Sequence, residues 1–169
     1  MTIADLLLPE YDLEVSKTRT LLALVPDAKL DFRPHPKSMP LGTLASHVSE
    51  IPGWMSMTLG TELLELGDGF TPFRVATTRE LLESLDTGAS TGRAALAAAP
   101  DEAMDVIWTL KWNGEVMVSQ PRSEVVRQFV MNHLIHHRAQ LGVYLRLLDV
   151  PIPGMYGASA DDMAAMKGQ

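Results

Sequence analysis

Residues 131–148 read MNHLIHHRAQLGVYLRLL, and this stretch decides the fold. Its apolar side chains recur at helical spacing, and no proline occurs between Arg122 and Leu148. We therefore predict one long helix from about Pro121 to Leu148, with the proline in the first turn, where a missing N–H is tolerated. His133 and His137 are four residues apart, so their side chains should lie about 40° apart on one face of this helix.

The helix face that carries the two histidines is apolar. The side chains within about 80° of His133 on a helical projection are Val126, Phe129, Val130, Leu141, Tyr144 and Leu148. By the same projection, Arg127, Arg138 and Arg146 are expected to point well away from this face. Buried imidazoles need partners, because an unpaired buried polar group costs about 1–3 kcal/mol. A shared metal ion would satisfy both rings, and ordinary structural hydrogen bonds are the alternative.

A second helix is predicted to begin near Leu41, and it carries His47 on its apolar side. The other residues on that side are Leu44, Ile51, Trp54 and Met55. Pro52 interrupts the pattern, so we expect a kink there. Three core-facing histidines on two helices indicate one shared site. For His47 taken alone, a hydrogen-bonded core histidine is the alternative. His35 lies in a proline-rich loop and is expected to be solvated.

Two further helices complete the predicted helical part. The first runs from about Ile3 to Leu24, and its Tyr11 and Glu14 sit among apolar residues and could reach the core. The third begins at Thr77, because Thr77 and Glu80 form a capping-box pattern.

Gly88 and Gly92 in the third helix could let another helix approach closely.

The segment that follows the third helix is rich in Val, Ile and Trp around Asn113-Gly114, which predicts a β-hairpin from about Met104 to Val118. The tail after Leu148 is expected to be irregular and to pack back on the helices. The predicted fold is an all-α four-helix bundle with a short β-hairpin between the third and fourth helices, forming a single domain over residues 1–169.

The composition argues against several classes of partner and of chemistry. The chain has 169 residues and a formal net charge of −7, with Lys and Arg scattered, so a nucleic-acid partner is disfavoured. It contains no cysteine, which excludes disulfides, thiolate ligands and a thiol nucleophile of its own. The apolar runs are far shorter than the ~20 residues that span a bilayer. Residues 1–12 show no basic leader, so we expect no membrane association and a cytoplasmic location.

The segments HPKSMPLGTLASHVSEIPGW (35–54) and NHLIHHRAQLGVYLRLLDVPIPGMYGASADD (132–162) resemble the DinB family, also described as the DinB/YfiT-like fold. The resemblance extends from the first helix to the tail. It implies a four-helix bundle, often a homodimer, with three histidines that bind a metal. The matching positions are His47, His133 and His137. The family usually has Gly at Ala139 and Pro at Ala158, and these departures concern the tail rather than the ligands.

Three neutral histidines leave open positions on a metal ion, which is typical of a catalytic site, and nickel or zinc suits imidazole ligands. The resemblance implies enzymes that use a low-molecular-weight thiol, and also proteins resembling metal-dependent hydrolases. Because the chain has no cysteine, the thiol must come from outside. We predict a metal-dependent enzyme that activates a small thiol for transfer to an electrophile. The alternatives are a hydrolase that uses metal-bound water and a non-catalytic, metal-binding dimeric scaffold.

Four other side chains are candidates for supporting roles. Glu50 lies one turn after His47 and is either the general base of a hydrolase or a solvated glutamate. Gln140 lies on the histidine-bearing face of its helix, and His136 lies at the edge of that face, where it would support the site or remain at the surface. Tyr156 in the tail could cover the mouth of the site.

Overall fold

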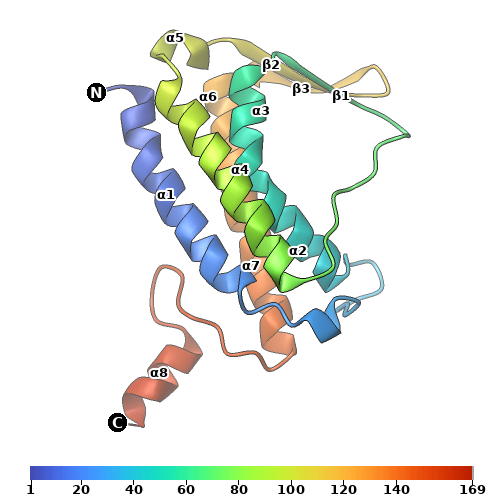
Figure 1. Ribbon diagram of the computed structural model, residues 1–169, viewed down its shortest axis with the longest axis vertical. Coiled ribbons are helices and arrows are strands. Elements are labelled where there is room, and N and C mark those ends of the chain that lie inside the picture. The colour runs from blue at the N-terminus through green and yellow to red at the C-terminus, as the bar shows by residue number, and fades with distance from the viewer. Residues whose placement is uncertain (169) are drawn as a thin grey trace.

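The computed structural model describes residues 1–168 and is mostly helical, with one small sheet (Figure 1). Its elements, in chain order, are α1 (Ile3–Leu22), η1 (Asp27–Lys29), α2 (Leu41–Glu50), η2 (Ile51–Gly53), α3 (Trp54–Gly60), β1 (Leu63–Leu66), α4 (Thr78–Ala98), α5 (Asp101–Met104), β2 (Ile107–Trp112), β3 (Glu115–Pro121), α6 (Arg122–Val125), η3 (Val126–Asn132), α7 (His133–Leu147) and α8 (Ala160–Lys167). The predicted mostly helical fold with a β insertion before the last long helix is confirmed. Among the described residues, no helix combines the length and the apolarity that crossing a membrane requires.

The long helices lie side by side around one core (Figure 1). Helix α4 contacts α1, α2 and α3, while α7 contacts both α1 and α2. Leu44, Leu85 and Leu141 are fully buried where these helices meet. Burying one such side chain contributes about 1.5–3 kcal/mol. This core fixes α2 and α7 against each other, and these are the two helices that carry the histidines.

The second predicted helix is interrupted at Pro52, as expected. Helix α2 ends at Glu50, the 3₁₀ turn η2 contains Pro52, and α3 begins at Trp54. Proline has no N–H to donate to the preceding turn, so the regular hydrogen-bond ladder cannot continue through it. The hydroxyl of Tyr11 donates to the Pro52 carbonyl at 2.9 Å, which ties the break to α1.

Two glycines of α4 allow η2 and its neighbours to approach this helix closely, as predicted. Gly88 faces Gly53 of η2, where a Cβ on Gly88 would lie 3.1 Å from the Gly53 nitrogen. A Cβ on Gly92 would overlap the Tyr11 hydroxyl and the Pro52 carbonyl oxygen. The third helix also begins as expected, since the Thr77 side chain accepts from the Glu80 N–H and the Glu80 carboxylate accepts from the Thr77 N–H.

The sheet is larger than predicted and is shifted along the chain. Strands β2 and β3 form the expected hairpin, with Asn113 and Gly114 at positive φ in the turn. The hairpin spans residues 107–121 rather than 104–118, because Met104 ends α5 and is buried. Strand β1 pairs in parallel with β2 and places Leu64 beside Leu110. A four-residue strand far from its partner in sequence leaves too little periodicity to be recognised.

Three predicted boundaries need correction. The first helix ends at Leu22 rather than near Leu24. Pro121 ends β3 and precedes α6 instead of lying in the first helical turn. The tail is not wholly irregular, because Ser159 and Asp162 form a capping box that begins α8.

Arg138 lies away from the histidine-bearing face, as the helical projection predicts, but it is buried on a second side of α7. Its side chain is only 2% exposed and donates to the carboxylate of Glu14, which is 4% exposed, and to the Glu14 carbonyl at 2.9 Å. Helix α7 is covered by α1 on a second side, which a single apolar stripe does not reveal. The tail adds Tyr156, whose hydroxyl donates to Glu14 at 2.7 Å. Glu14 and Tyr11 reach the core as expected.

Candidate metal centre

The structure brings the three predicted histidines together from two helices. His47 lies on α2, and His133 and His137 lie one turn apart at the start of α7. One ring nitrogen of each lies within 4.8 Å of the other two, and the Nε2 atoms of His47 and His133 are 3.2 Å apart. All three rings are half-buried. Three imidazoles from distant parts of the sequence therefore converge on one point.

Neighbouring side chains hold two of the rings by their Nδ1 atoms. Nδ1 of His47 lies 3.0 Å from Oε1 of Glu50, and Nδ1 of His137 lies 2.7 Å from Oε1 of Gln140. A carboxylate or carboxamide oxygen only accepts, so both Nδ1 atoms donate. In the neutral rings this leaves each Nε2 with a free lone pair. Partners of this kind orient metal-binding histidines.

Burial and mutual repulsion keep two of the rings unprotonated. Desolvation, followed by the nearby His137 and His47 rings, lowers the pKa of His133 to about 4. Desolvation also lowers the pKa of His137, against the opposing effect of its hydrogen bond to Gln140. At neutral pH these rings therefore present lone pairs rather than protons.

This donor set fits a divalent metal ion. Metal–imidazole nitrogen distances of about 2.0–2.1 Å place two ligand nitrogens about 2.9–3.4 Å apart for angles between 90° and tetrahedral. The 3.2 Å separation of the His47 and His133 Nε2 atoms falls within that range. Among the described residues this cluster offers three nitrogen ligands, which leaves room for an exchangeable molecule. His47, His133 and His137 could therefore hold a metal ion with an open coordination position.

A π-helical segment, η3, directly precedes His133. π-Helical turns are rare and often occur at functional sites. The side chain of Phe129, within η3, lines a cavity beside the histidines. The sequence carried no signal for this segment, because its apolar pattern is also compatible with a regular α-helix.

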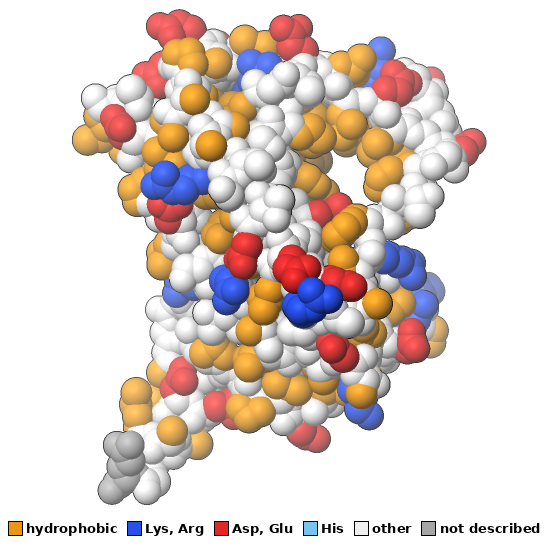
Figure 2. All heavy atoms as spheres, in the orientation of Figure 1, with side chains coloured by type: hydrophobic (Ala, Val, Ile, Leu, Met, Phe, Trp, Pro, Cys, Tyr) orange, Lys and Arg blue, Asp and Glu red, His pale blue; other side chains and the backbone are white. Residues whose placement is uncertain are grey.

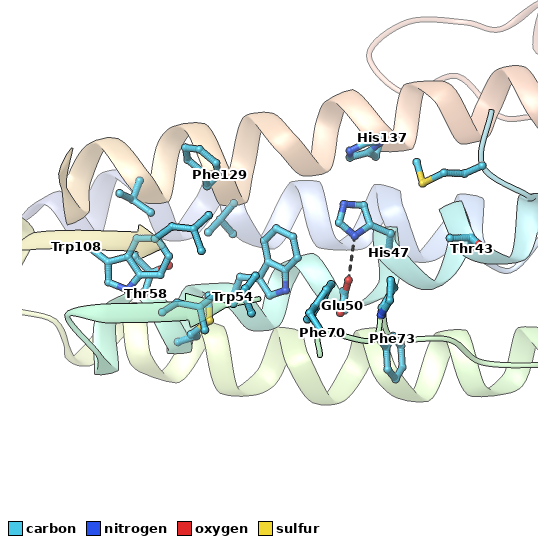
Figure 3. Close-up of a pocket in the computed structure, with 18 residues that line it drawn as sticks. Thr43, His47, Glu50, Trp54, Thr58, Phe70, Phe73, Trp108, Phe129 and His137 are labelled. Carbon is cyan, nitrogen blue, oxygen red and sulfur yellow. Dashed lines mark hydrogen bonds and ion pairs between the residues drawn. The ribbon is translucent and has the colours of Figure 1, made fainter. Parts of the chain in front are cut away.

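The cavity beside the triad has a volume of about 640 Å³. Its lining residues are Met39, Thr43, His47, Glu50, Trp54, Met57, Thr58, Leu64, Leu66, Phe70, Pro72, Phe73, Trp108, Leu110, Val125, Phe129, Val130 and His137. Figure 3 shows His47, Glu50 and His137 toward one end and Trp108 and Thr58 at the other. Two of the three histidines, His47 and His137, thus line a space large enough for a small molecule.

Trp54 lines this cavity next to the histidines. Its ring centroid is 5.3 Å from those of both His47 and His133. The sequence placed Trp54 on the same side as His47 but gave no reason to assign it to the site. The seven-residue spacing between His47 and Trp54, which places both on one side of a helix, could have assigned Trp54 to the site.

His136 and Tyr156, the two remaining candidates, lie outside the cavity lining. His136 is exposed, and its Nε2 lies 3.1 Å from the amide nitrogen of Gln140, whose Oε1 accepts a hydrogen bond from His137. The expectation that Tyr156 covers the site mouth is wrong. Tyr156 is 65% exposed, is absent from the cavity lining, and bonds to Glu14 and Arg138 instead.

Comparisons with known proteins agree with the resemblance. The family model described as "DinB family" matches residues 2–168. A DinB-like protein from Bacillus cereus ATCC 10987 has a similar crystal structure, with a TM-score of 0.69, 20% identity, and coverage of 88% of this chain and 95% of that one. A DinB-like protein from Bacillus subtilis has a TM-score of 0.66, 15% identity, and coverage of 88% and 96%. A comparison with curated proteins found no match. Since the family model spans almost the whole chain, this protein belongs to the DinB family.

Proposed function

We propose that this protein is a metal-dependent enzyme that activates a small external thiol for transfer to an electrophile. Nickel and zinc are the ions best suited to three imidazole ligands. The observation that carries the proposal is the convergence of His47, His133 and His137, two of which, His47 and His137, line the adjoining cavity. When bound there, the ion would supply Lewis acidity that lowers the pKa of a neighbouring thiol or water molecule.

The surroundings of the triad favour a thiol over water. The cavity lining is mostly hydrocarbon and aromatic, which suits a weakly hydrated sulfur atom. Glu50, the nearest carboxylate, accepts a hydrogen bond from His47 and is therefore engaged in orienting that ring. His47 and His137 both border the cavity, so a thiol and an electrophile could meet beside them. The chain has no cysteine, so the sulfur must belong to a small molecule.

Hydrolysis is the second candidate, and one observation favours it. Glu50 lines the cavity and its side chain is partly exposed, so its second carboxylate oxygen could accept a proton from water. A metal-binding homodimer without turnover is the third candidate. It would keep the triad but give no role to the adjoining cavity.

A thiol-consumption assay separates these candidates. Protein loaded with nickel or zinc is mixed with monochlorobimane and a panel of low-molecular-weight thiols. We expect conjugation that His137→Ala lowers at least 100-fold and that His35→Ala leaves unchanged, because His35 is exposed in the proline-rich loop. Cleavage of activated esters or amides without thiol would favour the hydrolase. Activity in neither assay across broad panels would contradict an enzymatic role.

A further inference from the structure

The cavity beside the triad presents almost no charge to a ligand. Among residues 1–168, no Lys or Arg side chain lines it. Glu50 is its one carboxylate, and that group is hydrogen-bonded to His47. Trp108 lies at the far end, and its indole N–H donates to Thr61 at 3.1 Å, so the ring offers the cavity an apolar surface. An anion in this space would be desolvated next to a carboxylate, and the lining side chains offer it no cation apart from a metal ion held by the histidines.

The sheet explains how the cavity acquires an apolar wall. Strand β1 pairs with β2 so that Leu64 lies beside Leu110, and both line the cavity. Side chains alternate across a strand, so Trp108 shares this inward face while Ile107 does not. Ile107 is half-exposed and is not part of the lining. The strand that the sequence did not predict thus completes one side of the cavity.

The loop between β1 and α4 forms the rim. Its Phe70 and Phe73 line the cavity and remain partly exposed. Figure 2 shows the surface hollowed between the helices and the segment that descends from the sheet, with hydrophobic side chains around the hollow. Figure 3 places Phe70 and Phe73 at the end of the cavity near His47. The apolar lining therefore continues to the solvent.

We propose that this cavity binds the body of a neutral, elongated and largely apolar substrate, aliphatic or aromatic, whose reacting group lies against His47 and His137. The position of the reacting group beside His47 and His137 rests on the proposed function. Binding of the apolar body depends on the cavity alone. The substrate class is therefore distinct from small charged metabolites, for which the lining provides no counter-charge.

The test uses a neutral fluorescent probe, N-phenyl-1-naphthylamine, and its displacement by n-alkanols. We expect the probe to bind wild-type protein. The affinity of the alkanols should rise about fourfold per methylene, which is the fold-change for about 0.8 kcal/mol per buried CH₂, until the cavity is filled. In metal-stripped protein, an alkyl sulfonate of the same chain length should bind at least tenfold more weakly than the alkanol, because no cationic side chain lines the cavity.

Two substitutions at Leu110 locate the binding in this cavity. Leu110→Lys should weaken probe binding at least tenfold by adding a charge, and Leu110→Trp should weaken it by filling space without a charge. Ile107→Lys is the matched control on the outer face of the same strand and should leave probe binding within twofold of wild type. Circular dichroism and thermal melting identify any variant that fails to fold.

Three results would overturn the inference: no probe binding by wild type, unchanged binding by both folded Leu110 variants, or equal binding of sulfonate and alkanol. Metal content and thiol conjugation are measured on the same preparations. Probe binding without metal or conjugation would overturn the proposed function and leave the cavity assignment intact. Conjugation of only small charged substrates, without probe binding, would overturn the cavity assignment and leave the proposed function intact.

Discussion

The Nε2 atoms of His47 and His133 lie 3.2 Å apart, although the two residues belong to different helices. Glu50 accepts from the other nitrogen of His47, so His47 presents a lone pair toward His133. His133 is itself half-buried and has a lowered pKa. Protonating both rings at once would place two positive charges in contact. The arrangement therefore favours a ligand that accepts lone pairs, which is what a metal ion does.

The metal-free protein should lose stability as the pH falls from about 6.5 toward 4. The folded-state pKa of His133 is about 4 and its ordinary value is 6.5, so between these values the unfolded chain binds a proton that the folded chain does not. His133 thus contributes a slope of at most about 1.4 kcal/mol per pH unit, with stability rising as pH rises. Urea denaturation of metal-stripped protein at pH 7, 6 and 5 measures this slope.

His133→Phe should flatten that slope, and His35→Phe should not. The window above pH 5 avoids carboxyl groups such as Asp27 and Asp161, whose pKa values hydrogen bonds hold below the ordinary range. Their stabilising effect is present at pH 5 and is lost only in stronger acid. Equal slopes in wild type and His133→Phe would show that His133 is not desolvated in the folded protein.

Removing Glu50 should weaken metal binding although Glu50 is not a ligand. Glu50→Ala deletes the acceptor that orients His47, and loss of such a partner typically costs 10–100-fold in affinity. Glu50→Gln keeps an acceptor oxygen and should lose less. Glu83→Ala is the control, since Glu83 is exposed and pairs with Arg79 on α4. Competition with a chromogenic chelator measures each affinity, and equal values for Glu50→Ala and Glu83→Ala would contradict the orienting role.

The buried pair of Glu14 and Arg138 should be sensitive to removal of either partner. Arg138→Met leaves the Glu14 carboxylate buried without its cation and should cost about 3–5 kcal/mol of the free energy of unfolding. The double variant Glu14→Leu, Arg138→Met should cost less than the sum of the two single changes. Tyr156→Phe removes the hydrogen bonds to Glu14 and Arg138 at a more exposed position and should cost about 1–2 kcal/mol. Additive effects in urea denaturation would contradict the coupling.

Gly92→Ala should destabilise the contact between α4 and the break at Pro52. The added methyl group would overlap the Tyr11 hydroxyl and the Pro52 carbonyl oxygen, and overpacking of this kind costs about 1–3 kcal/mol. Gly60→Ala is the comparison, because nothing lies within 4 Å of a Cβ at Gly60. Thermal melting should show a clear loss for Gly92→Ala and a change below about 1 kcal/mol for Gly60→Ala. Similar melting temperatures for the two variants would contradict the close approach.

Helical periodicity predicted most of the fold because the apolar residues of α2 and α4 gather on one face of each helix. The same periodicity placed His47, His133 and His137 in the core, and the resemblance to the DinB family joined them into one site. Pro52 and Thr77 marked a break and a helix start through local chemistry that does not depend on the rest of the chain. Such features can be predicted from sequence because their causes lie within a few residues.

The features that sequence did not reveal depend on distant contacts. Arg138 is buried because α1 and the tail cover a second side of α7, where Glu14 supplies the counter-charge. Strand β1 exists because β2 offers it an edge, and its four residues carry little pattern of their own. The cavity arises from β1, β2, the loop between β1 and α4, and the helices together. Its shape and apolar character follow from the assembled fold rather than from any one segment.

The first measurement is the metal content of purified, untagged protein, determined by mass spectrometry for wild type and His133→Ala. We expect close to one equivalent of nickel or zinc in wild type and a loss of that metal in the variant, with His35→Ala retaining it. Wild-type protein that holds no metal and takes up none when nickel or zinc is added would contradict a metal site at His47, His133 and His137 and leave three structural histidines in a helical core.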